Sequence, residues 1–270
     1  MMAAMKVSIV TPNFNGARFL EAAIRSVLAQ RDDGVDLEYI VADGGSTDGS
    51  LAIVERYRGR IDRFIGGPDN GPASAINKGL AAASGDILGL LNSDDLYRPG
   101  ALRRVFEALA PHPARALAFG RCRIVDEDGR EIRRGITRFK ESFFPVSSRF
   151  VIQSINYVSQ PAMFFRRRAW IEAGPLREDL AAALDYDLLL RLWRRGGAVR
   201  LSPPPLADFR WHPGSISGRR FARQFREEWE AAARDAGRWA PQTLAHWFVR
   251  WGIVGSYSAM AAARRRGTGA

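Results

Sequence analysis

Gly85-Asp86-Ile87-Leu88-Gly89-Leu90-Leu91-Asn92-Ser93-Asp94-Asp95 is the most informative stretch of the sequence. Its apolar residues, bounded by glycine and by a polar cluster, predict a short buried strand of a parallel sheet. Ligands of open α/β sheets bind beyond the carboxyl ends of such strands. Two adjacent carboxylates at that place suit a divalent cation, and a cation in turn attracts phosphate. A solvated turn would explain the same polar residues, because Asp and Ser favour turns, so this stretch alone leaves both interpretations open.

The residues before this stretch repeat the order strand, polar loop, helix. The sequence predicts strands at 6–10, 37–42 and 64–65, and helices through 19–28, 51–57 and 73–83, with a further helix from about Pro99. This repetition is typical of βαβ units and of a parallel sheet.

Polar side chains follow three of these strands at the point where each strand ends. They are Asn13 and Asn15 after the first strand, Asp43 after the second, and residues 92–95 after the strand quoted above. Because the carboxyl ends of parallel strands meet at one edge of a sheet, we expect these groups to lie close together. The sequence therefore favours a binding site over a set of independent turns.

The pattern changes after residue 116. Residues 117–125 and 130–136, joined across Asp128-Gly129, predict a hairpin. Further apolar strands are predicted at 162–165, 198–201 and 206–211, with helices at 167–173 and from about residue 184. Asp185 and Asp187 begin the latter helix, where the helix dipole favours acids. Helix capping therefore explains Asp185 as well as a functional role does.

Net charge separates the two halves of the chain. The sequence has 40 basic and 29 acidic residues. Residues 1–120 hold 13 of the basic and 14 of the acidic residues, so the basic excess lies after residue 120. Such a field attracts nucleic acid, an anionic membrane or phosphorylated ligands. No basic stripe interleaved with aromatic residues forms a nucleic-acid-binding motif, so nucleic acid is not expected as a partner.

The cysteine count and the two ends of the sequence bound the location of the protein. A single cysteine, Cys122, excludes an intrachain disulfide and a Cys-rich zinc site and suits a reducing compartment. Residues 1–6 lead directly into a strand, so no signal peptide is expected.

Residues 219–270 carry ten arginines against four acids, together with four tryptophans. They predict two amphipathic helices that pack on the domain or lie on a membrane surface. The least charged run, 251–263, is too short to span a bilayer as a helix.

Six segments, in the order of the chain, resemble the family 2 glycosyltransferases of the GT-A fold. They are Ser8-Ile9-Val10-Thr11-Pro12-Asn13-Phe14-Asn15, Asp43-Gly44-Gly45-Ser46-Thr47-Asp48-Gly49, Asn70-Gly71 with Asn77-Lys78-Gly79, Asn92-Ser93-Asp94-Asp95, Asp185-Tyr186-Asp187, and His212-Pro213-Gly214-Ser215-Ile216-Ser217. Each segment alone is unspecific, and together they cover roughly residues 5–218. The resemblance implies an α/β fold with a Rossmann-like, mostly parallel central sheet flanked by helices, followed by a small C-terminal helical extension.

The resemblance also implies roles for individual residues. The nucleotide sugar would be bound by Thr11, Pro12, Asn13, Asn15, Asp43, Asn70, Asn77 and Asp94, the last of these at the ribose. Asp95 would hold the divalent metal, Mg²⁺ or Mn²⁺, that bridges the diphosphate, and His212 would lie near it. Asp185 would be the general base, with Asp187 as its rival. An Asx-turn would also explain Asp43, and a strand cap would also explain His212.

The sequence departs from many members of the family at three places. Asn92 replaces an acid, and Ile76 replaces an arginine that helps to hold the nucleotide, which leaves the base open. The Gln-x-x-Arg-Trp motif of processive synthases is absent, since Ala207 stands where the glutamine would be. We therefore expect the transfer of one sugar per encounter.

The sequence thus predicts an inverting, metal-dependent glycosyltransferase of envelope or exopolysaccharide synthesis. Residues 1–218 would form the GT-A domain, with a nucleotide-sugar half to about 120 and an acceptor half after it, and 219–270 a basic extension. The partners would be a UDP- or GDP-sugar and a saccharide or lipid-linked saccharide acceptor, and a homo-oligomer is compatible with the sequence. The protein would be cytoplasmic, with the extension on the inner face of the plasma membrane. A sugar nucleotidyltransferase and a non-catalytic nucleotide-sugar-binding protein are the alternatives.

Overall fold

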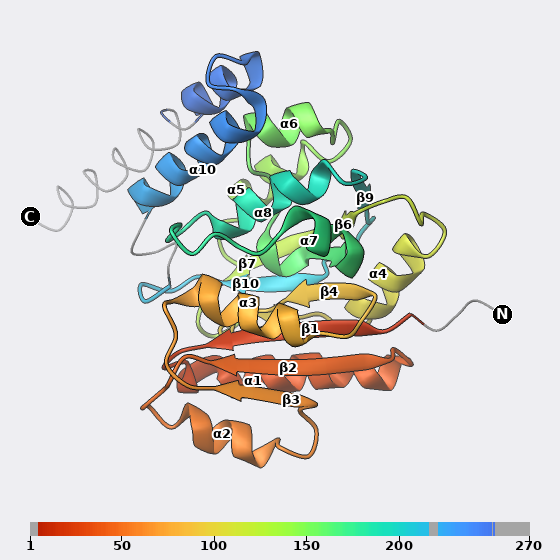
Figure 1. Ribbon diagram of the computed structural model, residues 1–270, viewed down its shortest axis with the longest axis vertical. Coiled ribbons are helices and arrows are strands. Elements are labelled where there is room, and N and C mark those ends of the chain that lie inside the picture. The colour runs from red at the N-terminus through yellow and green to blue at the C-terminus, as the bar shows by residue number, and fades with distance from the viewer. Residues whose placement is uncertain (1–4, 216–220, 250, 252–270) are drawn as a thin grey trace, which may run out of the picture.

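The computed structural model describes residues 5–215, 221–249 and 251, and its centre is a seven-stranded sheet (Figure 1). In spatial order the strands are β3 (Arg63–Gly66), β2 (Leu37–Asp43), β1 (Val7–Asn13), β4 (Ile87–Leu90), β8 (Met163–Arg166), β6 (Leu117–Phe119) and β9 (Ala198–Arg200). All pairs are parallel except those of β8, which runs antiparallel to β4 and β6. The predicted mostly parallel α/β sheet is confirmed.

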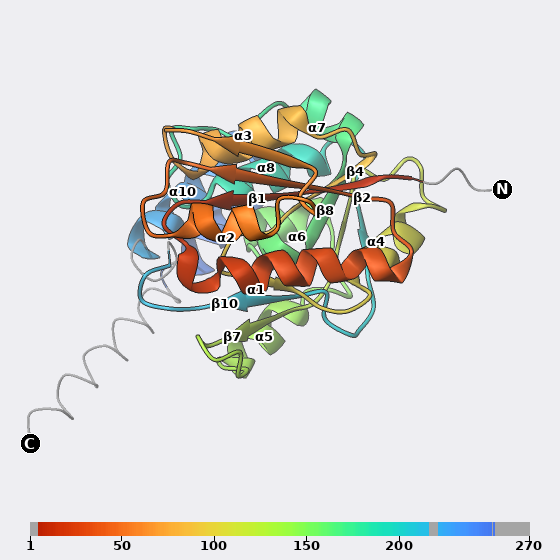
Figure 2. The same ribbon diagram turned by 90° about the horizontal axis from the view of Figure 1, so that it is seen from below.

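Helices cover both faces of this sheet, as Figures 1 and 2 show. One face carries α1 (Ala17–Leu28), α2 (Ser50–Arg56) and α4 (Ala101–Leu109), and the other carries α3 (Pro72–Ala82), α7 (Arg167–Ala173) and α8 (Leu184–Trp193). Because side chains alternate along a strand, β4 and the residue after it serve both cores: Ile87 and Leu91 enter one, and Leu88 and Leu90 the other.

Glycine at position 89 of β4 allows the closest packing in the centre of the sheet. A Cβ atom at Gly89 would lie 2.7 Å from Ile9 Cδ1 and 2.8 Å from Phe164 Cδ1. Gly79 does the same for α3, since a Cβ there would lie 2.4 Å from Val10 Cγ1. These two glycines let β4 and α3 approach β1 and β8, so the close approach of backbones explains their place in the sequence.

The predicted hairpin of residues 117–125 and 130–136 is wrong. β6 joins the central sheet, whereas β7 (Cys122–Val125) belongs to a second sheet with β10 (Ala207–Arg210) and β5 (Leu96–Tyr97). Beyond the turn at Asp128-Gly129 a single bridge joins Val125 to Glu131. The chain then enters α5 (Arg134–Glu141), because Ile136, Phe139 and Lys140 recur at helical spacing and face the cavity described below.

The remaining elements lie around the second half of the sheet. They are η1 (Ala29–Asp33), α6 (Arg149–Ser154), η2 (Gln160–Ala162) and α10 (Phe221–Ala236), and residues 241–249 are also helical. α10 lies along α8 and α6 (Figure 1) and buries Ala231 and Ala232 in the same core as α8. The predicted extension therefore begins with an element of the folded core. No helix in the described ranges is long and apolar enough to span a membrane.

Candidate functional site

The ends of β1 and β2 are joined by a hydrogen-bond network centred on Asp43. Its Oδ1 accepts the backbone N–H groups of Gly45 (3.0 Å) and Ser46 (2.7 Å), and its Oδ2 accepts Asn13 Nδ2 (2.6 Å) and Ser46 Oγ (2.7 Å). Asn13 and Asp43 are register partners of the parallel pair, which places them side by side. With both oxygens engaged and 3% of its surface exposed, Asp43 shapes the loop 43–49 as the Asx-turn interpretation required.

Asn13 keeps one polar atom for a ligand. Among the described residues its Oδ1 is buried and has no hydrogen-bond partner. Gly16 leaves the space beside it open, since a Cβ at that position would lie 2.4 Å from Asn13 Oδ1 and 2.6 Å from Ser93 Oγ. A buried acceptor without a donor costs free energy, so this atom suits an N–H group of a bound base.

The other predicted nucleotide contacts divide into buried and exposed residues. Pro12 is buried, and Thr11 is buried with its Oγ1 accepting from Tyr39 Oη at 3.1 Å. Asn15 and Asn70 are exposed, and Asn15 Oδ1 accepts from the N–H of Thr47. Of these four residues, only Asn15 and Asn70 present polar side chains to solvent.

Asn77, which was predicted to contact the nucleotide, makes a structural contact. Its Nδ2 donates to the carbonyl oxygen of Leu176 at 2.9 Å, and its Oδ1 accepts the N–H of the same residue at 2.8 Å. The amide therefore binds the loop before α8 to α3. The predicted nucleotide contact of Asn77 stays a prediction, and it would require the amide to exchange these hydrogen bonds for a ligand.

Asp94 and Asp95 lie in opposite environments at the end of β4. Asp95 is fully buried, with Oδ1 accepting the N–H of Arg210 (2.9 Å) and Oδ2 accepting Asn92 Nδ2 (3.2 Å). Burial, and then the charge of Asp94, hold the pKa of Asp95 well above its usual range. Asp94 is partly exposed, and its Oδ2 lies 3.1 Å from His212 Nε2. The acid beside His212 is therefore Asp94, whereas Asp95, the predicted metal ligand, ties β4 to β10.

The donor set at this edge is compatible with a metal shared with a ligand. Asp94 and His212 offer one carboxylate and one imidazole, which suit Mn²⁺ or Mg²⁺ only together with further oxygen ligands. No group of three or more His, Cys, Asp or Glu side chains that could hold a metal occurs in the part of the chain that the structure describes. The missing ligands would have to come from the diphosphate and water.

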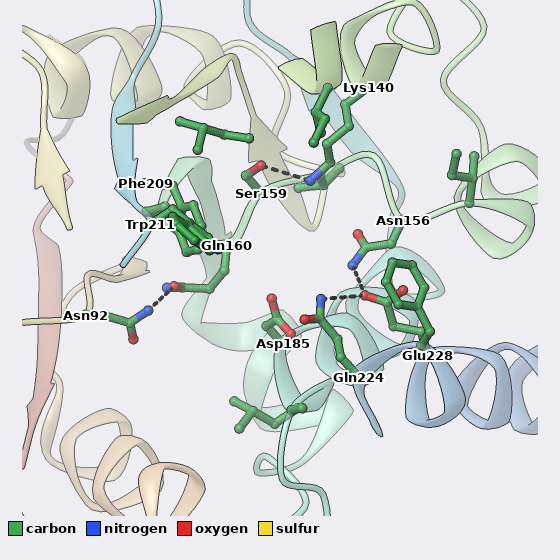
Figure 3. Close-up of a pocket in the computed structure, with 18 of the residues that line it drawn as sticks. Asn92, Lys140, Asn156, Ser159, Gln160, Asp185, Phe209, Trp211, Gln224 and Glu228 are labelled. Carbon is green, nitrogen blue, oxygen red and sulfur yellow. Dashed lines mark hydrogen bonds between the residues drawn. The ribbon is translucent and has the colours of Figure 1, made fainter. Parts of the chain in front are cut away.

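A cavity of about 480 Å³ lies between the end of β4, α5 and the beginning of α8 (Figure 3). Asn92 lines this cavity and donates a hydrogen bond to Gln160 Oε1 at 3.0 Å. Gln160 in turn donates to the carbonyl oxygen of Leu90. Much of the wall is apolar and includes Ile76, Leu90, Ile124, Ile136, Phe139, Ile155, Val158, Phe209, Trp211, Phe225 and Val249. Besides Asn92 and Gln160 at the end of β4, polar side chains of the wall lie near Asp185.

Asp185 lines this cavity, and Asp187 does not. Burial, and then the nearby Glu228, raise the pKa of Asp185 to about 6, against the lowering effects of backbone N–H groups and of Lys140. Asp187 is buried on another side of α8, where it pairs with Arg191 (2.9 Å) and Arg234 (3.4 Å). The structure thus separates the two acids that the sequence left as rivals: Asp185 faces the space for a ligand.

The polar residues that surround Asp185 were not predicted as site residues from the sequence. Lys140 donates to Ser159 Oγ at 3.1 Å, and Glu228 accepts from Asn156 Nδ2 (3.0 Å) and Gln224 Nε2 (3.1 Å), all at the cavity (Figure 3). They come from α5, α10 and the loop after α6, which belong to no motif. Lys140 is one of only three lysines in a sequence with 40 basic residues, which was the one available signal.

Comparisons with known proteins identify the family of this chain. The family profile described as Glycosyl transferase family 2 matches residues 8–174. The succinoglycan biosynthesis protein ExoO of Rhizobium meliloti is 33% identical over 220 residues, which are 78% of this chain and 62% of that protein. The chain spans only 18% to 32% of the length of several longer curated relatives.

Two solved structures share the fold. TarS of S. aureus in complex with UDP-GlcNAc superposes with a TM-score of 0.70 and 20% identity, over 92% of this chain and 72% of that one. A mannosyltransferase of Pyrobaculum calidifontis in complex with GDP-Man and Mn²⁺ gives a TM-score of 0.65 and 19% identity, over 96% and 81%. At these identities the likeness is one of fold. The predicted GT-A fold is confirmed.

Proposed function

This chain belongs to glycosyl transferase family 2, and from that membership we propose that it is an inverting, metal-dependent enzyme. It moves a sugar from a nucleoside diphosphate sugar to an acceptor hydroxyl. One observation carries the proposal: a cavity with a single lining aspartate, Asp185, adjoins the ends of β4 and β10, where Asp94 and His212 meet. A diphosphate at the strand end and an acceptor in the cavity would approach the sugar from opposite sides.

Asp94 and His212 are the residues that we propose to hold the metal. Their side chains lie 3.1 Å apart and are both accessible, whereas Asp95 is enclosed. When bound, a divalent cation supplies positive charge that stabilises the leaving diphosphate. Asp95 stabilises the position of this pair, because its hydrogen bond with the N–H of Arg210 fixes β10 two residues before His212.

Asp185 is proposed as the general base. Its carboxylate accepts the proton of the acceptor hydroxyl while the acceptor oxygen attacks the anomeric carbon on the face opposite the diphosphate, which inverts that carbon. The apolar walls exclude water and raise the pKa of Asp185 to about 6, so it is ionised at neutral pH and still basic enough to take a proton. Such a base is typically worth about 10²–10⁴-fold in rate.

The relatives suggest the classes of donor and acceptor. The structural neighbours were solved with UDP-GlcNAc or with GDP-Man and Mn²⁺, so we propose a UDP- or GDP-sugar and Mn²⁺ for this chain. ExoO acts in succinoglycan biosynthesis, and we propose a saccharide acceptor of exopolysaccharide or envelope synthesis. The cavity lining comes mainly from residues after 120, which supports the division into a nucleotide-sugar half and an acceptor half.

A lipid-linked acceptor would require the enzyme to work at a membrane, and we propose that the C-terminal part provides the contact. Trp247, Phe248 and Trp251 lie close together, with ring centroids 5.0 and 6.0 Å from that of Trp247, and are 40%, 68% and 53% exposed. Ten arginines fall within residues 219–270. Aromatic rings beside basic residues suit the interface of an anionic bilayer, such as the inner face of a plasma membrane.

Thermal shift and donor turnover test the enzymatic proposal. UDP-GlcNAc and GDP-mannose are added with and without Mn²⁺, and release of the nucleoside diphosphate is measured. We expect one donor to raise Tm and to do so strongly only with Mn²⁺, and Asp94→Asn or His212→Ala to remove the metal-dependent part. Asp185→Asn should keep the shift and lose about 10²–10⁴-fold in turnover.

The exposed Glu172→Gln on α7 serves as the control, with wild-type shift and turnover. Wild-type turnover in Asp185→Asn would end the assignment of the base and favour a non-catalytic nucleotide-sugar-binding protein.

A further inference from the structure

Helix α10 lies beyond the segment that matches the family profile, yet one of its acidic side chains contacts the loop that leads into α8, the helix that carries Asp185. Glu227 is 4% exposed, and its carboxylate accepts three consecutive backbone N–H groups, those of Ala181 (3.1 Å), Ala182 (2.8 Å) and Ala183 (3.1 Å). These residues lead directly into α8, whose second residue is Asp185. A side chain 42 residues further along the chain thus holds the beginning of the helix that bears the base.

The beginning of α8 has no cap of its own. The residue at its N-cap position is Ala183, which has no side-chain oxygen to accept an N–H group. Backbone N–H groups at the start of a helix need such an acceptor, and a buried one left unpaired costs about 1–3 kcal/mol. Glu227 supplies the acceptor for the N–H group of Ala183 and for those of the two residues before it, so the path of the loop into α8 depends on this one carboxylate.

Glu227 is itself held firmly. Arg223 Nε donates to its Oε1 at 2.6 Å within α10. At the other end of α10, Asp235 binds Arg149 (3.1 Å), Arg194 (2.6 Å) and Gln153 (2.5 Å), which fixes the helix to α6 and to the end of α8. Because Asp235 fixes α10 to α6 and α8, Glu227 can impose a position on the loop.

We propose that Glu227 is a positioning residue for Asp185, acting through the N–H groups of Ala181, Ala182 and Ala183. The inference rests on the proposed role of Asp185 as base. A base must meet the acceptor hydroxyl within hydrogen-bond reach, and a displacement of about 1 Å can cost about 10²-fold in rate. Figure 3 shows α10 beside the beginning of α8, with Gln224 and Glu228 directed to the same cavity as Asp185.

A double-mutant cycle between Glu227→Gln and Asp185→Asn tests this coupling. Glutamine keeps one carbonyl oxygen for the three N–H groups, but it loses the negative charge and turns its NH2 group toward Arg223 Nε, which is also a donor, so the hold on the loop weakens. Turnover is measured as nucleoside diphosphate release from UDP-GlcNAc or GDP-mannose, whichever is hydrolysed, over long incubations at high enzyme concentration. We expect Glu227→Gln to lower kcat by about 10- to 100-fold with donor KM unchanged. In the Asp185→Asn background the same substitution should change kcat by less than about twofold, because its effect passes through the missing carboxylate.

Two control substitutions on the same helix separate positioning from general stability. Asp235→Asn breaks the buried charge network that fixes the far end of α10 and does not touch residues 181–183, so it should lower Tm while lowering kcat less than Glu227→Gln does. Glu230→Gln, on a side chain that is 42% exposed, should change neither. Should Glu227→Gln not fold, Glu227→Asp takes its place, since it keeps the charge and shortens the reach by one methylene.

The outcomes distinguish this inference from the proposed function. Equal rate losses from Glu227→Gln in the wild-type and Asp185→Asn backgrounds would overturn the positioning role while leaving Asp185 as base. An unchanged kcat in Glu227→Gln would do the same. If Asp185→Asn itself turns over donor at the wild-type rate, the proposed base fails first, and the positioning role fails with it.

Discussion

Asp94 and Asp95 illustrate how far neighbouring residues can differ in function. Residues 92–95 form a turn that the N–H of Asp95 closes by donating to the carbonyl oxygen of Asn92 (3.0 Å), and this turn directs one carboxylate into the protein and leaves the other partly exposed. Asp95 accepts the N–H of Arg210, which joins two sheets, whereas Asp94 meets His212. The sequence predicted that the pair divides its work, with Asp95 at the metal. Because Asp94 is the accessible acid beside His212, we propose Asp94 for that role, and adjacent acids carry no sign in the sequence of which one is buried.

At the same scale, Glu228 should set the pH range of the reaction. The groups that face Asp185 are Glu228 from α10 and Lys140 from α5, and Glu228 raises the pKa of Asp185 while Lys140 lowers it. Since the base works when it is ionised, kcat/KM should rise with pH through about 6. Glu228→Gln removes a negative charge, so the rise should move to lower pH. A pH profile of donor turnover measures this.

The control for this prediction is Glu172→Gln, which lies on α7 away from the cavity. A profile of Glu228→Gln that coincides with that of the wild type would contradict the coupling between Glu228 and Asp185.

At the scale of elements, Asn77 ties α3 to the loop before α8. The sequence placed it in the nucleotide site, yet its amide pairs with both backbone groups of Leu176. Asn77→Ala leaves these groups without partners and should lower the free energy of unfolding by about 1–3 kcal/mol. The thermal shift caused by the donor should persist. Chemical denaturation and the donor titration measure the two effects.

Asn70→Ala is the matched control, because Asn70 is an exposed asparagine predicted for the same role. Its unfolding free energy should stay within about 0.5 kcal/mol of the wild type. A loss of donor binding in Asn77→Ala without loss of stability would support the predicted nucleotide contact.

The elements themselves were predictable where their pattern is local. β1, β2 and α3 carry apolar residues at clear spacing, and their predicted bounds agree with the structure to within a few residues. α5 was not recognised, because Arg134–Glu141 is a short and highly charged helix whose apolar side faces a cavity. Its residues follow a turn signal at Asp128-Gly129, which favoured a hairpin by local rules that the pairing of β7 with β10 overrides.

For the whole molecule, the C-terminal part combines a core helix with an exposed aromatic surface. Deleting residues 219–270 would remove α10 with Ala231, Ala232 and Glu227, so a truncated protein cannot report on membrane binding alone. Substitution of Trp247, Phe248 and Trp251 by serine tests the surface directly. Binding to vesicles with anionic lipid, measured by sedimentation, should fall at least about tenfold, since burying one such ring contributes about 1.5–3 kcal/mol.

Ile171→Ser is the control, because Ile171 is an exposed apolar residue on α7, far along the chain from this surface. Neutral vesicles should bind the wild type more weakly than anionic ones, as the arginines of 219–270 require. If the triple variant sediments with vesicles as the wild type does, the aromatic surface does not bind the membrane and would serve another partner.

The sequence by itself determined the alternation of strands and helices, the edge at which the polar loops meet, and the family. These depend on spacing and on short motifs, which are local properties of the chain. Only the tertiary structure decided that Asp94 and not Asp95 lies beside His212, that Asp185 and not Asp187 faces the cavity, and that Glu227 of α10 accepts the N–H groups of the residues that lead into α8. Each of these depends on burial and on contacts between segments tens of residues apart, and no local pattern encodes which of two acids the fold will enclose.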